Sequence, residues 1–223
     1  MVDGTVSKVD EQFLMQLLEG DRAGASKLVR NYLRNRKSVT DLYENVIRKA
    51  LYRVGELWEF NKITVAEEHT ATSITEAVMN ELYGDIISRE RLSRKAVLAC
   101  VEHETHQVGI KMAADVFEMK GWDTFFPGAN TPLPDLVRYM DKVQPDLLAL
   151  SLSVYFHLPA LKNMLQYIRQ VFPELPVIIG GQAFRYGGKE IAESYSHTTY
   201  ISNLPELELF IENFMNDGQT NPF

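Results

Sequence analysis

The sequence predicts an α/β protein in which an N-terminal four-helix bundle precedes a five-stranded parallel sheet. Two observations lead to this prediction. In residues 10–92 the apolar side chains recur every three or four positions, as they do on the buried face of a helix. In residues 93–223 short apolar runs alternate with amphipathic segments of helical length. We therefore expect a four-helix bundle cap at residues 1–92 and a sheet domain at residues 93–223.

Polar breaks divide the helical half into four segments. Apolar residues cluster at 13–18, 28–33 and 42–58, and the breaks fall at 20–21, 35–38 and 61–62. Ser38 with Asp41, and Thr64 with Glu67, have the spacing of an N-terminal cap, in which the first side chain accepts a hydrogen bond from a backbone N–H of the first turn. These two pairs predict the starts of the third and fourth helices.

Five apolar runs predict the strands of the second half. They lie at residues 96–101, 124–126, 147–152, 177–179 and 199–201, and segments of helical length separate them. Alternation of strands and helices is typical of a parallel sheet with right-handed crossovers and helices on both faces. The expected fold of this half is therefore flavodoxin-like (Rossmann-like).

Composition excludes several classes of function. The formal net charge is -7 and the 23 Lys+Arg are scattered, so no basic stripe is available to neutralise phosphates, and we expect no direct nucleic-acid binding. The most apolar stretch, residues 147–156, is too short to span a bilayer, which takes about 20 apolar residues. The N-terminus lacks the pattern of a signal peptide, and a single cysteine excludes an intramolecular disulfide. We expect a cytoplasmic protein without a membrane partner.

No common catalytic motif is present. The sequence contains no Gly-x-Ser-x-Gly, no Walker-type loop and no Gly-x-Gly-x-x-Gly. His103 and His106 are three residues apart, whereas the zinc proteases need His-Glu-x-x-His. Cys100 lies inside a predicted strand, where we expect a buried small hydrophobic residue rather than a nucleophile. We expect no enzymatic activity of the chain by itself.

The segment 102–109 places two imidazoles and two carboxylates directly after the first predicted strand. Open α/β sheets bind ligands beyond the carboxyl ends of their strands. A neutral imidazole such as His106 is a common metal ligand, and Glu104 is placed to hold its other ring nitrogen. Gly109 would let a bulky ligand approach the following helix. The alternative is a polar loop with solvated histidines.

A second cluster lies in the helical half. Trp58 is near the end of the third predicted helix, and Glu68 and His69 fall in the first turns of the fourth. The three side chains can converge where these helices cross. The alternative is that the tryptophan packs in the bundle and the glutamate favours the positive end of the helix dipole.

Residues 104–109 resemble the signature of cobalamin-binding domains. Glu104, His106 and Gly109 match Asp-x-His-x-x-Gly, except that glutamate replaces the aspartate. The resemblance implies that cobalamin is bound and that His106 is the lower axial ligand of cobalt. The extra methylene of Glu104 predicts a looser hydrogen bond to His106, and a change of this kind can cost about 10- to 100-fold in metal affinity.

Two further elements of that family follow in order. Ser151-Leu152-Ser153, at the end of the third predicted strand, resembles its Ser-x-Leu element, and Gly180-Gly181 follows the fourth strand. The resemblance implies that Ser151, Ser153, Gly180 and Gly181 line a channel for the dimethylbenzimidazole tail. Tyr155 and His157 come just after the third strand, where they either contact the ligand or have no role.

The cluster in the helical half resembles one group of cobalamin-binding proteins in particular. Trp58, nine residues, then Glu68-His69 is similar to the cap motif of cobalamin-dependent, light-responsive transcription regulators. This implies a photosensor in which Trp58, Glu68 and His69 surround the upper ligand, with adenosylcobalamin the favoured form. The bundle begins near Met1 without a winged helix-turn-helix, so we expect signalling through a protein partner or a homo-oligomer. Two alternatives stay open: a corrinoid carrier protein of a methyltransferase system, and a photosensor that binds a bilin on the same fold.

Overall fold

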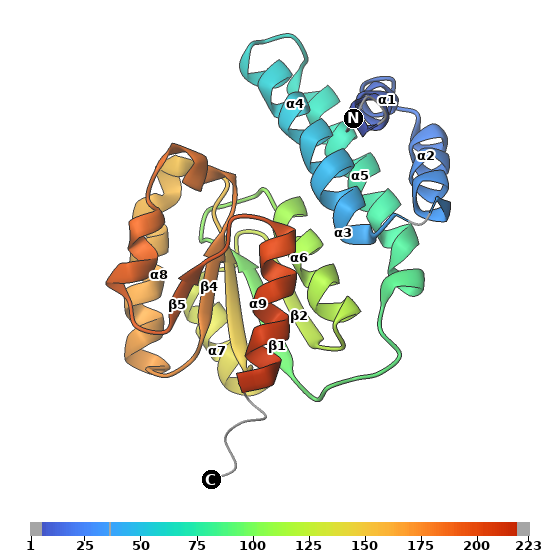
Figure 1. The fold of residues 1–223 in the computed structure, drawn as a ribbon. Helices are drawn as coiled ribbons and strands as arrows, with labels where there is room; N and C mark the ends of the chain where they lie inside the picture. Colours follow the sequence, from blue (N-terminus) through green and yellow to red (C-terminus); the bar gives the residue numbers. More distant parts are fainter. Residues whose placement is uncertain (1–5, 36, 218–223) are drawn as a thin grey trace. The chain divides into compact units, whose positions relative to one another are not determined.

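The computed structural model describes residues 6–35 and 37–217 (Figure 1). The chain forms two compact units, Met1–Ile86 and Ile87–Phe223. The first unit is helical and the second contains the whole sheet.

The helical unit has the four expected helical segments. They are α1 (Val6–Leu18), α2 (Arg22–Arg34), the continuous run of α3 (Val39–Leu42), a π-helix (Tyr43–Ile47) and α4 (Arg48–Glu59), and finally α5 (Val65–Ile86). Helix α1 packs against α2, α4 and α5. The core between them is apolar, with Phe13, Leu17, Val78 and Met79 almost completely buried.

Both predicted caps are present. The backbone N–H of Asp41 donates to Ser38 Oγ over 2.9 Å, at the start of α3. Thr64 and Glu67 form a complete reciprocal box, because the N–H of Thr64 donates to Glu67 Oε2 over 2.7 Å and the N–H of Glu67 donates to Thr64 Oγ1 over 3.2 Å. These bonds satisfy N–H groups that the helix itself leaves without partners. They fix where the third and fourth helices begin.

The π-helix was not predicted from the sequence. It inserts one extra residue into the turn at Tyr43–Ile47, and such turns occur mostly as single turns inside α-helices. Tyr43, Val46 and Ile47 are fully buried, so their packing offsets the poorer backbone geometry. Glu44 is also buried and forms an ion pair with Arg48.

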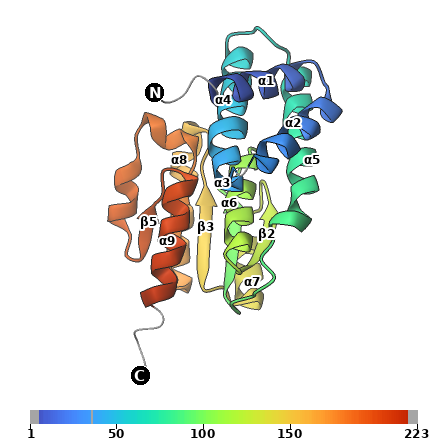
Figure 2. The same cartoon turned by 45° about the vertical axis from the view of Figure 1, so that its right-hand side comes forward.

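The second unit is a five-stranded parallel sheet with the order β2-β1-β3-β4-β5. Figure 2 shows β3 between β5 and β2. Its strands are β1 (Lys95–Cys100), β2 (Asp123–Gly128), β3 (Leu147–Ser151), β4 (Val177–Gly180) and β5 (Thr198–Tyr200). Helices α6 (Val108–Met119) and α9 (Leu204–Asp217) pack together on one face. Helices α7 (Leu133–Val143) and α8 (Leu158–Val171) share a core with the other face. The expected fold class is confirmed.

The connection from β4 to β5 departs from the expected strand–helix alternation. It consists of two 3₁₀ helices, Gln182–Tyr186 and Lys189–Ser194, in place of an α-helix. Gly187 and Gly188 separate them with φ of 125° and 88°, conformations that end a right-handed helix.

In the part of the chain that the structure describes, no helix combines the length and apolarity needed to cross a bilayer.

Candidate functional site

Glu104 is a completely buried carboxylate in the loop between β1 and α6. Its Oε1 lies 2.5 Å from Nδ1 of His106. Its Oε2 accepts hydrogen bonds from the backbone N–H groups of Ser153, over 3.0 Å, and Val154, over 2.8 Å. The carboxylate therefore joins the loop after β1 to the loop after β3, at the carboxyl edge of the sheet where this fold binds ligands.

These contacts determine the charge of Glu104. Burial raises the pKa of its carboxyl, but the hydrogen bonds from His106, Val154 and Ser153 outweigh burial and bring the pKa down to about 2. Each of these donors is stronger toward an ionised acceptor than toward a neutral one. Glu104 is therefore an anion at neutral pH.

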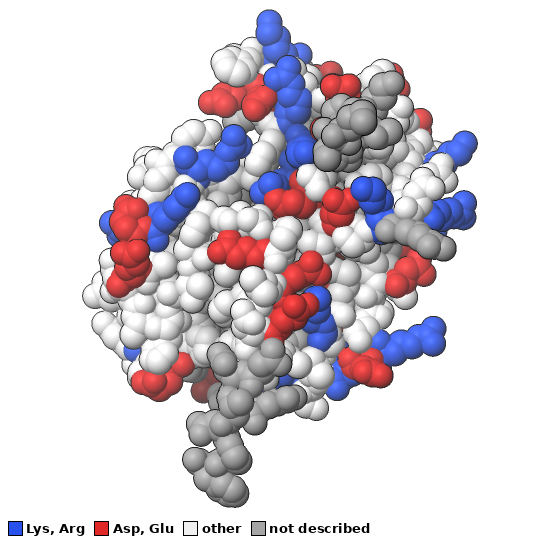
Figure 3. Space-filling model, in the orientation of Figure 1, with Lys and Arg blue, Asp and Glu red and all other residues white. Residues whose placement is uncertain are grey.

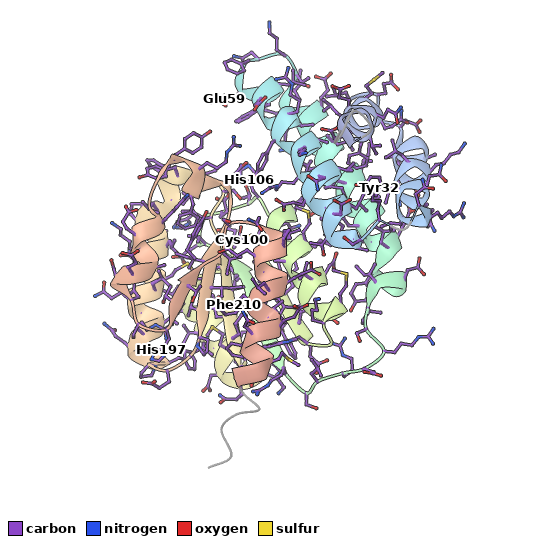
Figure 4. All side chains as sticks on the ribbon, in the orientation of Figure 1. Tyr32, Glu59, Cys100, His106, His197 and Phe210 are labelled. Carbon is purple, nitrogen blue, oxygen red and sulfur yellow. The ribbon has the colours of Figure 1, made fainter. Side chains whose placement is uncertain are left out.

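His106, which is labelled in Figure 4, has the arrangement expected of a metal-binding imidazole. Its side chain is 53% exposed, and the hydrogen bond from Nδ1 to Glu104 assigns the proton to that nitrogen. The lone pair of the neutral ring then resides on Nε2, which is the atom that binds a metal in this tautomer. The predicted pairing of Glu104 with His106 is thus present.

The expectation of a looser hydrogen bond at Glu104 was wrong. The 2.5 Å separation from His106 Nδ1 is short for a hydrogen bond between nitrogen and oxygen. The longer glutamate side chain brings one oxygen to His106, while the other reaches the N–H groups of Ser153 and Val154. The added length of the glutamate side chain is accommodated because its second oxygen accepts these two N–H groups.

Gly109 leaves open space at the start of α6. A Cβ placed on it would meet no atom within 4 Å. Glycine inside a helix costs about 0.5–1 kcal/mol relative to alanine, so packing within the protein gives no reason for this residue. Room for a bulky group beside the helix does give one.

Backbone packing explains the two glycines of the predicted tail channel, but it does not explain the two serines. In the described ranges no hydrogen bond is made by the hydroxyls of Ser151 and Ser153, so they are available to a ligand. Gly181 has φ of 117°, and a Cβ there would lie 2.2 Å from the backbone oxygen of Leu152. A Cβ on Gly180 would lie 2.9 Å from the backbone oxygen of Ile201. Both glycines are therefore required by the protein's own backbone.

The helical unit carries the second predicted cluster. Trp58 is 48% exposed near the end of α4, although indole is costly to leave in water. Glu68 Oε2 lies 3.6 Å from Nε2 of His69, and Glu68 Oε1 accepts a hydrogen bond from Thr72 over 2.9 Å. The side chain of His69 is 75% exposed. None of the three predicted residues belongs to the buried core of this unit.

Two nearby residues have roles that the sequence did not reveal. Glu102 accepts the backbone N–H of Leu133 over 3.1 Å, so it caps the start of α7. His157 lies with Nδ1 3.5 Å from Glu104 Oε2. Finding either contact requires knowing how loops after different strands approach one another. No spacing within one segment signals them.

The donor set restricts the kind of metal that fits. Residues 6–35 and 37–217 contain no group of three or more His, Cys, Asp or Glu that could hold a metal ion. Cys100 is buried, and burial followed by the charge of Glu104 raises the pKa of its thiol to about 12, so it supplies no thiolate. A metal at His106 must obtain its remaining ligands from a cofactor. A corrin supplies four nitrogens, so a single imidazole, the space at Gly109 and the serine hydroxyls fit such a group.

Models of known protein families match both halves of the chain. One model described as a B12 binding domain matches residues 94–202, and a second with the same description matches residues 9–83. The chain belongs to the B12-binding domain family. It therefore binds cobalamin, and the predicted resemblance is confirmed.

Curated relatives of this B12-binding protein are transcriptional repressors by name. The "HTH-type transcriptional repressor CarH" of Myxococcus xanthus is 32% identical over 145 residues, which are 64% of this chain and 48% of the relative. The repressor CarA of the same organism is 27% identical over 124 residues, 56% of this chain and 43% of the relative. The chain spans about half the length of the curated relatives it matches.

The monomethylamine corrinoid protein of Methanosarcina barkeri has the same fold. The two structures superpose with a TM-score of 0.79 at 14% identity, over 94% of this chain and 99% of the other. At this identity the likeness concerns the fold alone.

Proposed function

We propose that this B12-binding protein is a light sensor that uses adenosylcobalamin and signals through a protein partner or a change of oligomer. The observation that carries the proposal is the exposure of Trp58 together with Glu68 and His69 in the spacing of the light-responsive regulators. The 32% identity to the repressor CarH supports it. On the face drawn in Figure 3, acidic and basic side chains are interspersed, in keeping with a protein partner rather than DNA.

His106 would hold cobalt through Nε2, and Glu104 would hold the Nδ1 proton of His106. In the helical unit, Trp58 would shield the adenosyl group from water, and Glu68 and His69 would offer an acceptor and a donor to its hydroxyl groups. Adenosylcobalamin would supply a light-sensitive cobalt–carbon bond, and a contact of Trp58 that exists only in the dark would let light shift the population of conformations.

The test is a comparison of dark and illuminated protein. The chain is purified with adenosylcobalamin in darkness, and its absorption spectrum and oligomeric mass are measured before and after light. We expect a spectral change and a change in mass or in the binding of a partner. Photolysis by itself changes the spectrum of adenosylcobalamin, so a loaded protein whose mass and partner binding both stay unchanged on illumination overturns the sensor.

Loading the protein with other ligands separates the two alternatives. A corrinoid carrier would retain methylcobalamin and transfer its methyl group to a partner enzyme, with no change of mass in light. A bilin photosensor would absorb in the red after incubation with a linear tetrapyrrole. The fold shared with the monomethylamine corrinoid protein is compatible with the carrier, but the exposed Trp58 favours the sensor.

A further inference from the structure

Helix α2 of the helical unit carries a basic stripe on its exposed face. The helix has no acidic residue, although the chain as a whole has a net charge of -7. Its apolar face, with Ala25, Val29 and Tyr32, is buried. The exposed face carries the cations Arg22, Lys27, Arg30 and Arg34. This stripe was not recognised from the sequence, because its members are three to five positions apart.

A groove of about 650 Å³ lies beside the basic stripe, where α2 packs against α5. All four cations of the stripe line it, and so does Glu81 of α5. Every residue that lines the groove belongs to the helical unit. A concave surface lined by charges of one sign concentrates ligands of the opposite sign.

Glu81 is paired with two arginines of the stripe. Its Oε2 accepts a hydrogen bond from Ser26 Oγ over 2.5 Å and lies 3.3 Å from Nη2 of Arg30. Its Oε1 lies 3.5 Å from Nη2 of Arg22. Glu81 thus meets each guanidinium at one nitrogen, whereas a guanidinium has five N–H donors. Both arginines keep donors for a further acceptor.

The stability of α2 does not explain the stripe. Within residues 6–35 and 37–217, neither Lys27 nor Arg34 forms an ion pair. Arg30 and Arg34 are four positions apart, a spacing at which like charges repel each other on a helix. Arg22 lies at the first position of α2, where the helix dipole disfavours a cation. Binding of an anion to the stripe would offset these costs.

The charge and length of the stripe favour an acidic protein segment over nucleic acid. The net charge of -7 repels a long polyanion that extends beyond the stripe, whereas a short segment meets the stripe alone. From Arg22 to Arg34 the stripe is about 18 Å long, at about 1.5 Å per residue. An extended segment of about six residues has the same length.

We propose that the groove between α2 and α5 binds an acidic segment of a partner protein, whose carboxylates pair with the basic stripe. Arginine binds carboxylates through two parallel N–H···O bonds, and arginine clusters recognise acidic motifs in other proteins. Glu81 holds Arg22 and Arg30 in the free protein and competes with the incoming carboxylates. The inference names the docking surface for the partner of the proposed function and rests on that proposal.

The experiment measures binding of defined probes to the full chain, free of cobalamin and in darkness. The probes are a labelled hexaglutamate peptide, the matching hexaglutamine peptide and a short labelled DNA duplex, and fluorescence anisotropy gives each Kd. We expect hexaglutamate to bind, with a Kd that rises with ionic strength, and hexaglutamine not to bind. No binding of hexaglutamate at low ionic strength overturns the proposal. Tighter binding of the duplex than of hexaglutamate also overturns it and assigns the stripe to nucleic acid.

Two double variants place the binding on the stripe. Arg30→Gln with Arg34→Gln should weaken hexaglutamate binding by about tenfold. Arg53→Gln with Lys62→Gln removes the same charge from the same unit outside the groove and should change the Kd by less than about twofold. An equal loss in the two double variants means attraction by net charge alone and overturns the proposal. Circular dichroism confirms folding, and Arg34→Gln alone serves if the first double variant does not fold.

Glu81→Gln gives an effect of opposite sign. The amide oxygen still accepts the hydrogen bond of Ser26, but it no longer holds Arg22 and Arg30 by charge, so hexaglutamate should bind about threefold more tightly. Glu56→Gln is the control, because Glu56 pairs with Arg53 outside the groove and its loss should leave the Kd unchanged. Unchanged or weaker binding in Glu81→Gln, or an equal gain in Glu56→Gln, overturns the proposal. Because no cobalamin or light is used, these results are independent of whether the protein proves to be a light sensor.

Discussion

The carboxylate of Glu104 and the imidazole of His106 form one unit, with Oε1 2.5 Å from Nδ1 and the carboxylate completely removed from solvent. His106 remains half exposed, so the buried partner orients the ring and the ring presents its far nitrogen outward. The orientation costs nothing at the moment of binding because the protein has already fixed it.

Replacing Glu104 by glutamine should weaken both the fold and the site. The amide turns an N–H toward groups that are themselves donors, and we expect a loss of about 2–3 kcal/mol in the free energy of unfolding. Cobalt ligation by His106 should fall by about 10- to 100-fold. Urea unfolding and the absorption spectrum of the loaded protein measure the two effects. Glu102→Gln is the control, because its amide oxygen still accepts the N–H of Leu133 and neither quantity should change appreciably.

The contribution of Glu104 to stability should depend on pH. Its pKa is about 2 in the folded protein and 4.5 in a free side chain, so its ionised form favours the folded state. The stabilisation is fully present above pH 4.5, is lost as the pH falls toward 2, and is on the order of 3 kcal/mol. Unfolding free energies of wild type and Glu104→Gln should therefore converge between pH 4.5 and pH 2.5. A gap of constant size over that range would contradict the assignment.

Substituting Gly109 should separate stability from binding. A methyl group at this position meets no atom within 4 Å, so Gly109→Ala should stabilise the helix by about 0.5–1 kcal/mol while it reduces cobalamin affinity. Gly84→Ala is a matched control in α5, where the space is equally open and only stability should rise. Thermal melting and equilibrium dialysis measure the two quantities. Unchanged cobalamin affinity in Gly109→Ala would remove this residue from the site.

Trp58→Ala should impair the cofactor and spare the fold. Because Trp58 is 48% exposed, the free energy of unfolding should change by less than about 1 kcal/mol, whereas Met79→Ala in the buried core should cost about 2–5 kcal/mol. Loss of a large apolar contact should lower retention of adenosylcobalamin in the dark by about tenfold or more.

The control for Trp58 is another exposed aromatic residue nearby in the sequence. Phe60 is 70% exposed and lies outside the Trp-Glu-His spacing, so Phe60→Ala should leave adenosylcobalamin retention and the light response unchanged. An equal loss of adenosylcobalamin retention in the two variants would mean that the whole turn between α4 and α5 is disturbed. In that case the tryptophan would have no particular role.

Much of the fold could be predicted because local patterns carry it. The runs in β1, β3 and β4 are apolar throughout, since strands covered on both faces need no alternation, and they were recognised from this feature. Ser38 and Thr64 marked helix starts because a cap needs only residues within one turn. The pair of Glu104 and His106 was found for the same reason, as the partners are two positions apart.

What could not be predicted depends on contacts between distant segments. The close approach of Gly181 to Leu152 and the contact of His157 with Glu104 join loops from different strands. Glu102 is the other carboxylate of the segment 102–109, and it accepts the N–H of Leu133 at the start of α7. The spacing of residues along the sequence does not reveal these contacts between distant segments.

The π turn at Tyr43–Ile47 has a consequence for the tryptophan that follows it along the same helical run. One extra residue in this turn rotates the direction of every following side chain by about 100° around the helix axis, compared with an unbroken α-helix. The direction in which Trp58 points from the helix therefore depends on a turn that precedes the Trp-x9-Glu-His motif. Deleting one residue from that turn would leave the motif unchanged and point the indole in another direction.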